Sequence, residues 1–267
     1  MGEKKRLLTK EEAKNLAPGD EHYTSYVGYP KWYDVIGALQ FRLLCSLGLR
    51  ENHKLFDFGC GSLRAGKLLI PYLNRGNYFG FDPNEWLIQD AILNEIGNDL
   101  INIKQPIFEY DAACLSKSFK RSFDYILAHS IFTHTGEDKL RDSLQYFSDM
   151  SKNSGIIVAT FFFEGKVNND GRQYSGWIYP GCTHFNHDFI LELFNEYGFY
   201  GALLPWFHPA GQKWYIASTD KSKIPSSKII KQLKGTILFS EFDMNSETSS
   251  NNSQASIWDR LLFHIGR

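Results

Sequence analysis

The segment HKLFDFGCGSLRAGKLLI, residues 53–70, constrains the fold of this 267-residue chain more than any other part of it. Its apolar first residues predict a buried strand. Gly59 and Gly61 then predict a tight turn, because two residues without a Cβ atom let a ligand approach the main chain closely. The residues that follow predict a short helix ending near Pro71, whose nitrogen has no hydrogen to donate. A strand, a glycine turn and a helix form the first unit of a nucleotide-binding βαβ fold.

Two classes of adenosine ligand use such a turn. A dinucleotide needs the spacing G-x-G-x-x-G, and Arg64 stands where the third glycine belongs, which argues against a nicotinamide-dependent oxidoreductase. S-adenosylmethionine needs an open turn for its amino-acid portion and an acid for its ribose. The stretch LFDFGCGSLRAG resembles the first motif of class I S-adenosylmethionine-dependent methyltransferases, although Leu63 stands where their commonest form has a further glycine. A turn that binds nothing is the remaining alternative.

Two acids follow the glycine turn, at the ends of the next two predicted strands. Asp82 lies about 20 residues beyond the turn, where a carboxylate accepts hydrogen bonds from ribose hydroxyls, and a simple helix cap is the alternative role. Asp111, followed by Ala112, ends the third strand. A fourth strand over residues 123–128 leads into a loop, residues 129–136, at the edge where open parallel sheets bind ligands.

The rest of the pattern predicts the end of the sheet. Residues 155–163 are continuously apolar, as a buried parallel strand is. An amphipathic helix is expected from His184 to Gly198. Residues 201–207 and 213–219 predict two last strands, and their short connection makes them antiparallel. The ordered pattern resembles class I methyltransferases from about residue 30 to residue 219. This resemblance implies an α/β fold with a doubly wound, mostly parallel seven-stranded sheet and an antiparallel last strand.

The resemblance also implies S-adenosyl-L-methionine as the cofactor. In the family, an acid followed by a small residue lies beside the adenine amino group. The apolar spacing from Trp32 to Leu49 predicts a helix just before the first strand, which could cover the site. The flanking segments are similar to bacterial methyltransferases associated with surface glycans or secondary metabolites. The residues expected at the cofactor are Asp57, Gly59, Cys60, Gly61, Arg64, Asp82, Asp111, Ala112, His129, Tyr26 and Gln40.

Methyl transfer is an in-line displacement, so the site must align acceptor, methyl group and sulfur. A hydroxyl acceptor benefits from a base, and histidine has a suitable pKa. His134, on the fourth-strand loop, is the first candidate for the base, and His184 and His208 are the alternatives. The pair His184 and His187 near Cys182 resembles part of a zinc site but lacks a third defined ligand, so no metal is expected.

Three segments flank or interrupt the expected domain. Residues 1–30 form an N-terminal arm, and residues 31–219 form the methyltransferase domain. The polar, glycine-rich loop 164–182 is long enough to cover a substrate pocket. Residues 220–267 form a polar, partly disordered extension, whose apolar end would dock on the domain or on a second copy of the chain, giving a homodimer. The arm, this loop and the 205–214 turn are expected to build the acceptor pocket.

Composition excludes several functions. The formal net charge is -1, which argues against nucleic acid as a partner. The four cysteines are scattered and the chain shows no signal-peptide pattern, which indicates a cytoplasmic protein. No run approaches the length of about 18 apolar residues, so we expect no membrane segment. We therefore expect O-methylation of a small molecule, with a sugar or nucleotide-sugar for a surface glycan as the favoured acceptor. The alternatives are an NAD(P)-dependent oxidoreductase and a non-catalytic cofactor-binding protein.

Overall fold

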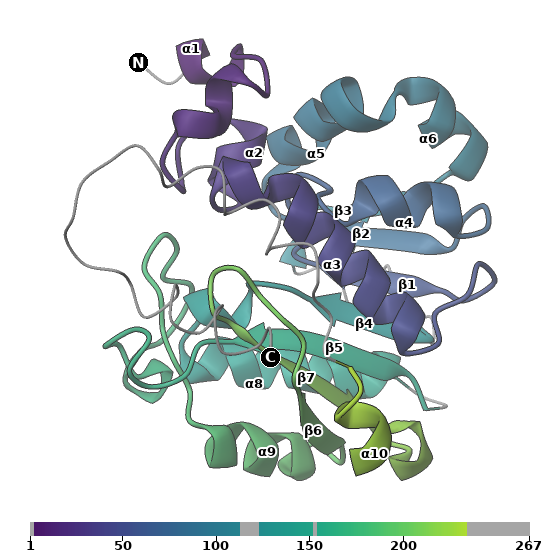
Figure 1. The fold of residues 1–267 in the computed structure, drawn as a ribbon, viewed down its shortest axis with the longest axis vertical. Helices are drawn as coiled ribbons and strands as arrows, with labels where there is room; N and C mark the ends of the chain where they lie inside the picture. The colour runs from purple at the N-terminus through teal and green to yellow at the C-terminus, as the bar shows by residue number, and fades with distance from the viewer. Residues whose placement is uncertain (1–2, 113–122, 152–153, 234–267) are drawn as a thin grey trace. The chain divides into compact units, whose positions relative to one another are not determined.

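The computed structural model describes residues 3–112, 123–151 and 154–233 (Figure 1). Contacts within the chain divide it into two units, residues 1–234 and residues 235–267. The second unit, which carries most of the predicted C-terminal extension and its apolar end, lies outside the described residues. The described part of the extension holds a short 3-10 turn, η7 (Lys221–Lys223), and one helical turn, α10 (Ser227–Ile230).

A seven-stranded sheet forms the centre of the described chain, with strand order β3-β2-β1-β4-β5-β7-β6. The strand β1 pairs in parallel with β2 on one side and with β4 on the other, and β7 is antiparallel to both β5 and β6. The predicted sheet, mostly parallel with an antiparallel last strand, is therefore confirmed. The strands are β1 (Leu55–Phe58), β2 (Tyr78–Phe81), β3 (Ile107–Glu109), β4 (Tyr125–Ala128), β5 (Ile156–Phe161), β6 (Tyr200–Leu204) and β7 (Lys213–Ser218).

Helices cover both faces of the sheet. The helices α3 and α4 lie over one face, and α8 and α9 lie over the other (Figure 1). None of the described helices is long and apolar enough to cross a membrane. The helical segments before β4 are α1 (Glu3–Arg6), η1 (Glu12–Asn15), α2 (Tyr23–Tyr26), η2 (Pro30–Trp32), α3 (Tyr33–Ser46), α4 (Gly66–Tyr72), α5 (Glu85–Ala91), η3 (Ile92–Ile96) and α6 (Asn98–Lys104). Those after it are η5 (Phe132–His134), α8 (Glu137–Met150), η6 (Gly171–Gln173) and α9 (His187–Glu196).

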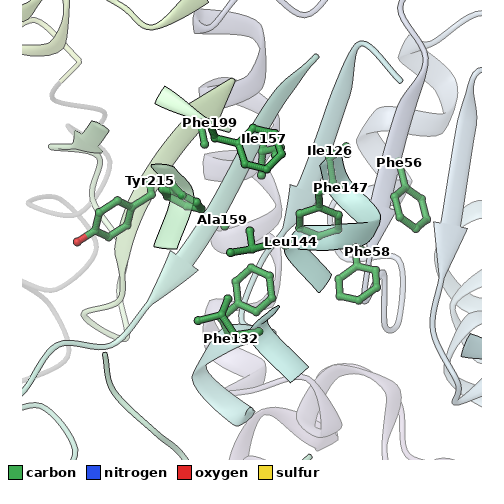
Figure 2. Close-up of a cluster of buried hydrophobic side chains, with 14 of the residues drawn as sticks. Phe56, Phe58, Ile126, Phe132, Leu144, Phe147, Ile157, Ala159, Phe199 and Tyr215 are labelled. Carbon is green, nitrogen blue, oxygen red and sulfur yellow. The ribbon is translucent and has the colours of Figure 1, made fainter. Parts of the chain in front are cut away.

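The main hydrophobic core lies between the sheet and the helices α8 and α9 (Figure 2). Side chains alternate along each strand, so Phe56 and Phe58 of β1 enter this core and Asp57 between them faces the other side. Phe147 of α8 packs edge-on against Phe58, with ring centroids 5.2 Å apart. The core therefore fixes β1 firmly and leaves its acid on the face that α3 and α4 cover.

Two predicted helix boundaries are wrong. The helix after the glycine turn begins at Gly66 rather than directly after the turn, because Leu63 has a left-handed φ of 53° that no helix allows. Its end at Tyr72, one residue after Pro71, agrees with the predicted end near Pro71. The helix expected from His184 begins at His187, because the side chain of Asn186 accepts a hydrogen bond from Phe189 N and caps the helix there.

Candidate functional site

A pocket of about 670 Å³ lies at the carboxyl ends of β1, β2 and β4. This is the edge at which open α/β sheets bind ligands, and the volume is typical of a small-molecule site. The wall includes parts of the N-terminal arm, of the 164–182 loop and of the 205–214 turn. Twelve of the predicted site residues line it: Tyr26, Gln40, Asp57, Gly59, Cys60, Gly61, Arg64, Asp82, Ala112, His129, His134 and His208.

The glycine turn is held against the end of β2. The backbone N–H groups of Gly59 and Cys60 both donate to Phe81 O, at 2.8 and 2.9 Å. Gly59 has a φ of 76°, and a Cβ atom there would lie 1.9 Å from Cδ1 of Ile131. Gly61 also has a left-handed φ, of 52°. Both glycines are therefore required by conformation, and both line the pocket.

Helix α3 packs directly on the residues that follow the turn. A Cβ atom on Gly37 would lie 2.3 Å from Arg64 O, so only glycine lets the helix approach this closely. Tyr33 donates a hydrogen bond from its hydroxyl to Ser62 O at 2.6 Å. Leu63 is fully buried and takes the left-handed conformation that a glycine would adopt freely. Leu63 therefore takes a glycine-like conformation at the position where the commonest form of the resembling motif has a glycine.

Asp82 organises the turn and faces the pocket. Its Oδ2 accepts a hydrogen bond from Gly61 N at 2.9 Å, and its Oδ1 accepts from N and Nδ2 of Asn84 at 2.9 and 3.0 Å. Burial raises the pKa of this carboxyl, and the three hydrogen bonds oppose the shift. A carboxylate has about four acceptor sites and the protein fills three of them, so a ligand hydroxyl can still donate to Oδ2. Asn84 directly precedes α5, so the contact with Asn84 also fits the alternative role of Asp82, a cap at the start of that helix.

Asp57 lies in β1, two residues before Gly59, and its side chain is buried. Tyr78 donates a hydrogen bond from its hydroxyl to Asp57 Oδ2 at 2.7 Å. Burial raises the pKa of Asp57 to about 7, although this hydrogen bond favours the charged form. The charge of Asp57 therefore changes near neutral pH.

Arg64, His129 and His208 form a buried chain of contacts along the pocket wall. Arg64 Nη2 lies 2.9 Å from His129 Nδ1, and His129 Nε2 lies 2.8 Å from His208 Nε2. Burial and the charge of Arg64 lower the pKa of His129 well below its usual range, and they lower the pKa of His208 to about 3. Both rings are therefore neutral at pH 7. The contact between His129 and His208 joins the end of β4 to the turn before β7.

His134 is oriented by the 164–182 loop. Its Nδ1 lies 2.7 Å from Gly181 O, and a carbonyl oxygen can only accept, so Nδ1 carries the hydrogen. Its Nε2 then holds a lone pair. Burial lowers the pKa of His134, which keeps the ring neutral at pH 7. Tyr179 of the same loop packs edge-on against the imidazole, with centroids 5.0 Å apart.

Two predicted site residues do not line the pocket. Asp111 is exposed beyond the end of β3, and its backbone N–H donates to Glu109 Oε1 at 3.1 Å. Its neighbour Ala112 does line the pocket, and the chain after it, residues 113–122, lies outside the described part. His184 is buried at the base of the 164–182 loop, where its backbone N–H donates to Asn169 O at 2.8 Å.

The histidines after this loop are not arranged as metal ligands. His184 precedes α9 and His187 begins it, so the two rings do not share a helix face. His187 Nδ1 lies 2.8 Å from the hydroxyl of Tyr215. Within residues 3–112, 123–151 and 154–233, no three His, Cys, Asp or Glu side chains are placed to hold a metal ion.

The structure adds pocket residues that the sequence pattern did not single out. Ser130 and Gln212 line the wall and hydrogen-bond each other, with Gln212 Nε2 2.7 Å from Ser130 Oγ. A group of aromatic residues lines it as well, from the arm, from the end of η2 just after the arm and from the 164–182 loop: Tyr29, Trp32, Trp177 and Tyr179. Tyr29 and Trp177 are each 53% exposed, which is high for large rings. The sequence did carry a signal for these residues, because several aromatic residues lie in or next to the arm and the 164–182 loop, two of the segments expected to build the acceptor pocket.

Comparison with known proteins establishes the fold. No model of a known protein family matches the chain. Among solved structures, magnesium protoporphyrin IX methyltransferase from Synechocystis PCC 6803 with bound SAH has a TM-score of 0.52 and 14% identity, over 73% of this chain and 89% of that one. A putative O-methyltransferase from Nostoc punctiforme has a TM-score of 0.55 and 14% identity, over 76% of this chain and 62% of that one.

A third similar structure is an amino pentose methyltransferase from Micromonospora echinaspora, involved in calicheamicin biosynthesis and bound to SAM. Its TM-score is 0.50 and its identity 12%, over 70% of this chain and 92% of that one. These likenesses, all at low identity, show that the chain has the fold of S-adenosylmethionine-dependent methyltransferases. The fold expected from the resemblance of its first motif is thereby confirmed.

Proposed function

We propose that this protein is an S-adenosylmethionine-dependent methyltransferase that acts on a hydroxyl oxygen of a small molecule. One observation carries the proposal: a single pocket brings the open glycine turn and Asp82 together with His134, an imidazole whose Nε2 holds a lone pair. The first two features fit a cofactor with a ribose and an amino-acid portion. The third fits the removal of a proton from an acceptor. Structures with the same fold bind SAM or SAH.

The residues present fit that cofactor. Asp82 Oδ2 would accept a hydrogen bond from a ribose hydroxyl, the turn at Gly59 and Gly61 would lie along the amino-acid portion, and Ala112 would lie beside the adenine. When bound, S-adenosylmethionine supplies a methyl group on a positively charged sulfur. The remaining pocket wall would position the acceptor hydroxyl in line with that methyl group.

His134 is the proposed general base. The acceptor oxygen would take the methyl group that the bound cofactor supplies, and the electron pair of the broken carbon–sulfur bond would stay on sulfur. The hydroxyl proton passes to His134 Nε2, while Nδ1–H remains bonded to Gly181 O. His208 is a weaker candidate because its Nε2 faces His129 Nε2 at 2.8 Å. His184 is weaker still because it does not line the pocket.

A sugar is the favoured acceptor. Tyr29, Trp32 and Trp177 line the pocket, and the C–H groups of a sugar would stack on aromatic rings of this kind. A nucleotide-sugar would bring a diphosphate, and Arg64 is the one lysine or arginine among the described residues that line the pocket. We therefore favour a sugar without a diphosphate. The cofactor-bound amino pentose methyltransferase has the same fold and a sugar among the words of its name.

The test is methyl transfer by the purified full-length chain. The protein is incubated with S-adenosylmethionine and, in separate reactions, monosaccharides, nucleotide-sugars and phenols, and S-adenosylhomocysteine is measured by chromatography. We expect turnover on a monosaccharide or glycoside and a methylated product by mass spectrometry. Turnover on phenols alone would refute the sugar assignment. Tight cofactor binding with no turnover on any acceptor would favour a non-catalytic binding protein.

His134→Ala then tests the base. We expect its turnover to fall by about 100-fold or more while the affinity for S-adenosylhomocysteine is unchanged. His53→Ala is the matched control, because His53 lies before the amino end of β1, away from the pocket wall. Unchanged turnover in His134→Ala would contradict the assignment and direct attention to His208.

A further inference from the structure

Gln212 carries a buried carboxamide with few partners. The residue directly precedes β7 and is 6% exposed. Its Nε2 lies 2.7 Å and its Oε1 lies 3.0 Å from Ser130 Oγ, and its side chain makes no other hydrogen bond within the described residues. An amide nitrogen has two hydrogens and an amide oxygen has two lone pairs, whereas Ser130 offers a single hydroxyl. One N–H and one lone pair of the carboxamide are therefore left over by the described part of the chain.

Ser130 has an unusual backbone conformation. Its φ of 59° is left-handed, which residues other than glycine rarely adopt. Its backbone N–H donates to Oγ1 of Thr160 at 2.7 Å, and Thr160 is fully buried in β5. Strained residues of this kind gather at ligand sites. A serine at a position that favours glycine therefore indicates a use for its hydroxyl.

Ser130 and Gln212 lie on the acceptor side of the pocket. In the sheet, β2 and β3 lie on one side of β1, and β4, β5 and β7 lie on the other. Asp82 follows β2, so the proposed ribose lies on the first side. Ser130 follows β4 and Gln212 precedes β7, which puts both on the second side, and both line the pocket. His134, the proposed base, belongs to the same loop as Ser130.

The wall around Ser130 and Gln212 is uncharged. Within the described stretches from residue 129 to residue 212, no Asp, Glu, Lys or Arg lines the pocket. Burial lowers the pKa of His208 to about 3, so this neighbouring ring is neutral at pH 7. A charged group is costly to bury in such surroundings. A carboxylate only accepts and an ammonium group only donates, whereas a hydroxyl does both. The spare N–H and lone pair of Gln212 therefore fit an uncharged hydroxyl.

We propose that Ser130 and Gln212 bind a second hydroxyl of the acceptor, beside the hydroxyl that is methylated. This inference rests on the proposed function and names the substrate class more closely: a diol or polyol rather than an alcohol or phenol with one hydroxyl. The second hydroxyl accepts from the spare N–H of Gln212 or donates to its spare lone pair, so either orientation of the carboxamide offers it a partner. Ser130 holds the carboxamide in place through its own hydroxyl.

The first arm of the test measures methyl transfer to two probes that differ by one hydroxyl, cis-1,2-cyclohexanediol and cyclohexanol. Release of S-adenosylhomocysteine gives kcat/KM for the full-length wild type, Gln212→Met, Ser130→Gly and Gln145→Met, whose glutamine is exposed on α8 and serves as control. We expect the wild type and Gln145→Met to prefer the diol by about 10-fold or more. Gln212→Met and Ser130→Gly should prefer it by no more than about twofold, which two equivalent hydroxyls give by number alone.

The two variants separate recognition from a merely structural role. Glycine takes the left-handed φ of Ser130 without strain, so Ser130→Gly keeps the backbone bond to Thr160 and loses only the hydroxyl. If Ser130 and Gln212 only tie the loop after β4 to the turn before β7, both variants unfold at a lower temperature and keep the preference for the diol. That result would overturn the proposal, as would a wild type that methylates both probes equally well.

The second arm needs no turnover and follows the side-chain amide signals of Gln212 in ¹H–¹⁵N spectra of the wild type, assigned through bonds to its own backbone. Each probe is added to the free and to the S-adenosylhomocysteine-bound protein. We expect these signals to shift at about 10-fold lower concentration of the diol than of cyclohexanol. Signals that respond to neither probe, or equally to both, would overturn the proposal.

Failure of the proposed function gives a different result. No acceptor would then release S-adenosylhomocysteine, and the amide signals of Gln212 in the free protein would still show whether the diol is bound. If the protein methylates other acceptors but neither probe, the same signals decide. Should Gln212→Met not fold, Ser130→Gly carries the first arm.

Discussion

Replacing Asp82 by alanine tests how the cofactor end of the pocket works. The Asp82 carboxylate accepts three hydrogen bonds from the protein, one from Gly61 N and two from Asn84. In the proposed complex its Oδ2 also accepts from a ribose hydroxyl. The substitution therefore removes a direct ligand contact and the acceptor that holds Gly61 N–H in place.

The magnitude follows from the number and kind of bonds. A hydrogen bond to a charged group is worth about 1.5–3 kcal/mol. Burial already makes the charged form of Asp82 costly, as its raised pKa shows, so the ligand bonds offset only part of the charge's cost. We expect affinity for S-adenosylhomocysteine to fall by about 1–3 kcal/mol, which corresponds to roughly 5- to 150-fold.

Isothermal titration calorimetry with S-adenosylhomocysteine measures this loss directly. Asp99→Ala is the matched control, because Asp99 is exposed on α6 and does not line the pocket. Circular dichroism of both variants checks that they fold. If Asp82→Ala folds and binds with wild-type affinity, the ribose does not lie at Asp82 and the assignment of this end of the pocket is wrong.

Two other substitutions test the surroundings of the turn. The folded-state pKa of Asp57, about 7 against an ordinary 3.8, means that its contribution to stability is present below pH 4 and is lost as pH rises to 7. In urea unfolding, the free energy of unfolding of Asp57→Asn should therefore rise relative to that of the wild type by up to about 4 kcal/mol between pH 4 and pH 8. The control Asp99→Asn, at an exposed position, should show no such rise. A difference between Asp57→Asn and the wild type that stays constant with pH would refute the raised pKa of Asp57. Gly37→Ala would press its Cβ to 2.3 Å from Arg64 O, so we expect a fall in the free energy of unfolding of about 1–3 kcal/mol, and wild-type stability would contradict the packing of α3.

The sequence predicted the elements whose signals are local. The strand with its glycine turn, Asp82 after the second strand, and the antiparallel end of the sheet all follow from short patterns of apolar residues and glycines. The helix boundaries were missed for equally local reasons. Because Leu63 has a left-handed conformation, α4 begins later than predicted, and because Asn186 caps α9, that helix also begins later than predicted. The spacing of apolar residues predicts neither the left-handed conformation of Leu63 nor the cap at Asn186.

Long-range contacts in the site had no such signal. His129 and His208 meet although 79 residues separate them, and nothing in either neighbourhood specifies the partner. The orientation of His134 depends on Gly181 in a loop 47 residues away. The sequence could therefore name these histidines as candidates, but only the folded pocket shows which nitrogen is free and which is already engaged.

Thermal unfolding with three ligands tests the central claim most directly. S-adenosylmethionine, S-adenosylhomocysteine and NAD are each added far above a plausible dissociation constant. A ligand at about 100 times its dissociation constant stabilises the folded chain by about 2.7 kcal/mol, which raises the midpoint by a few degrees for a protein of this size. We predict a shift with both adenosyl-sulfur ligands and none with NAD. A shift with NAD alone would contradict the claim that this pocket binds S-adenosylmethionine.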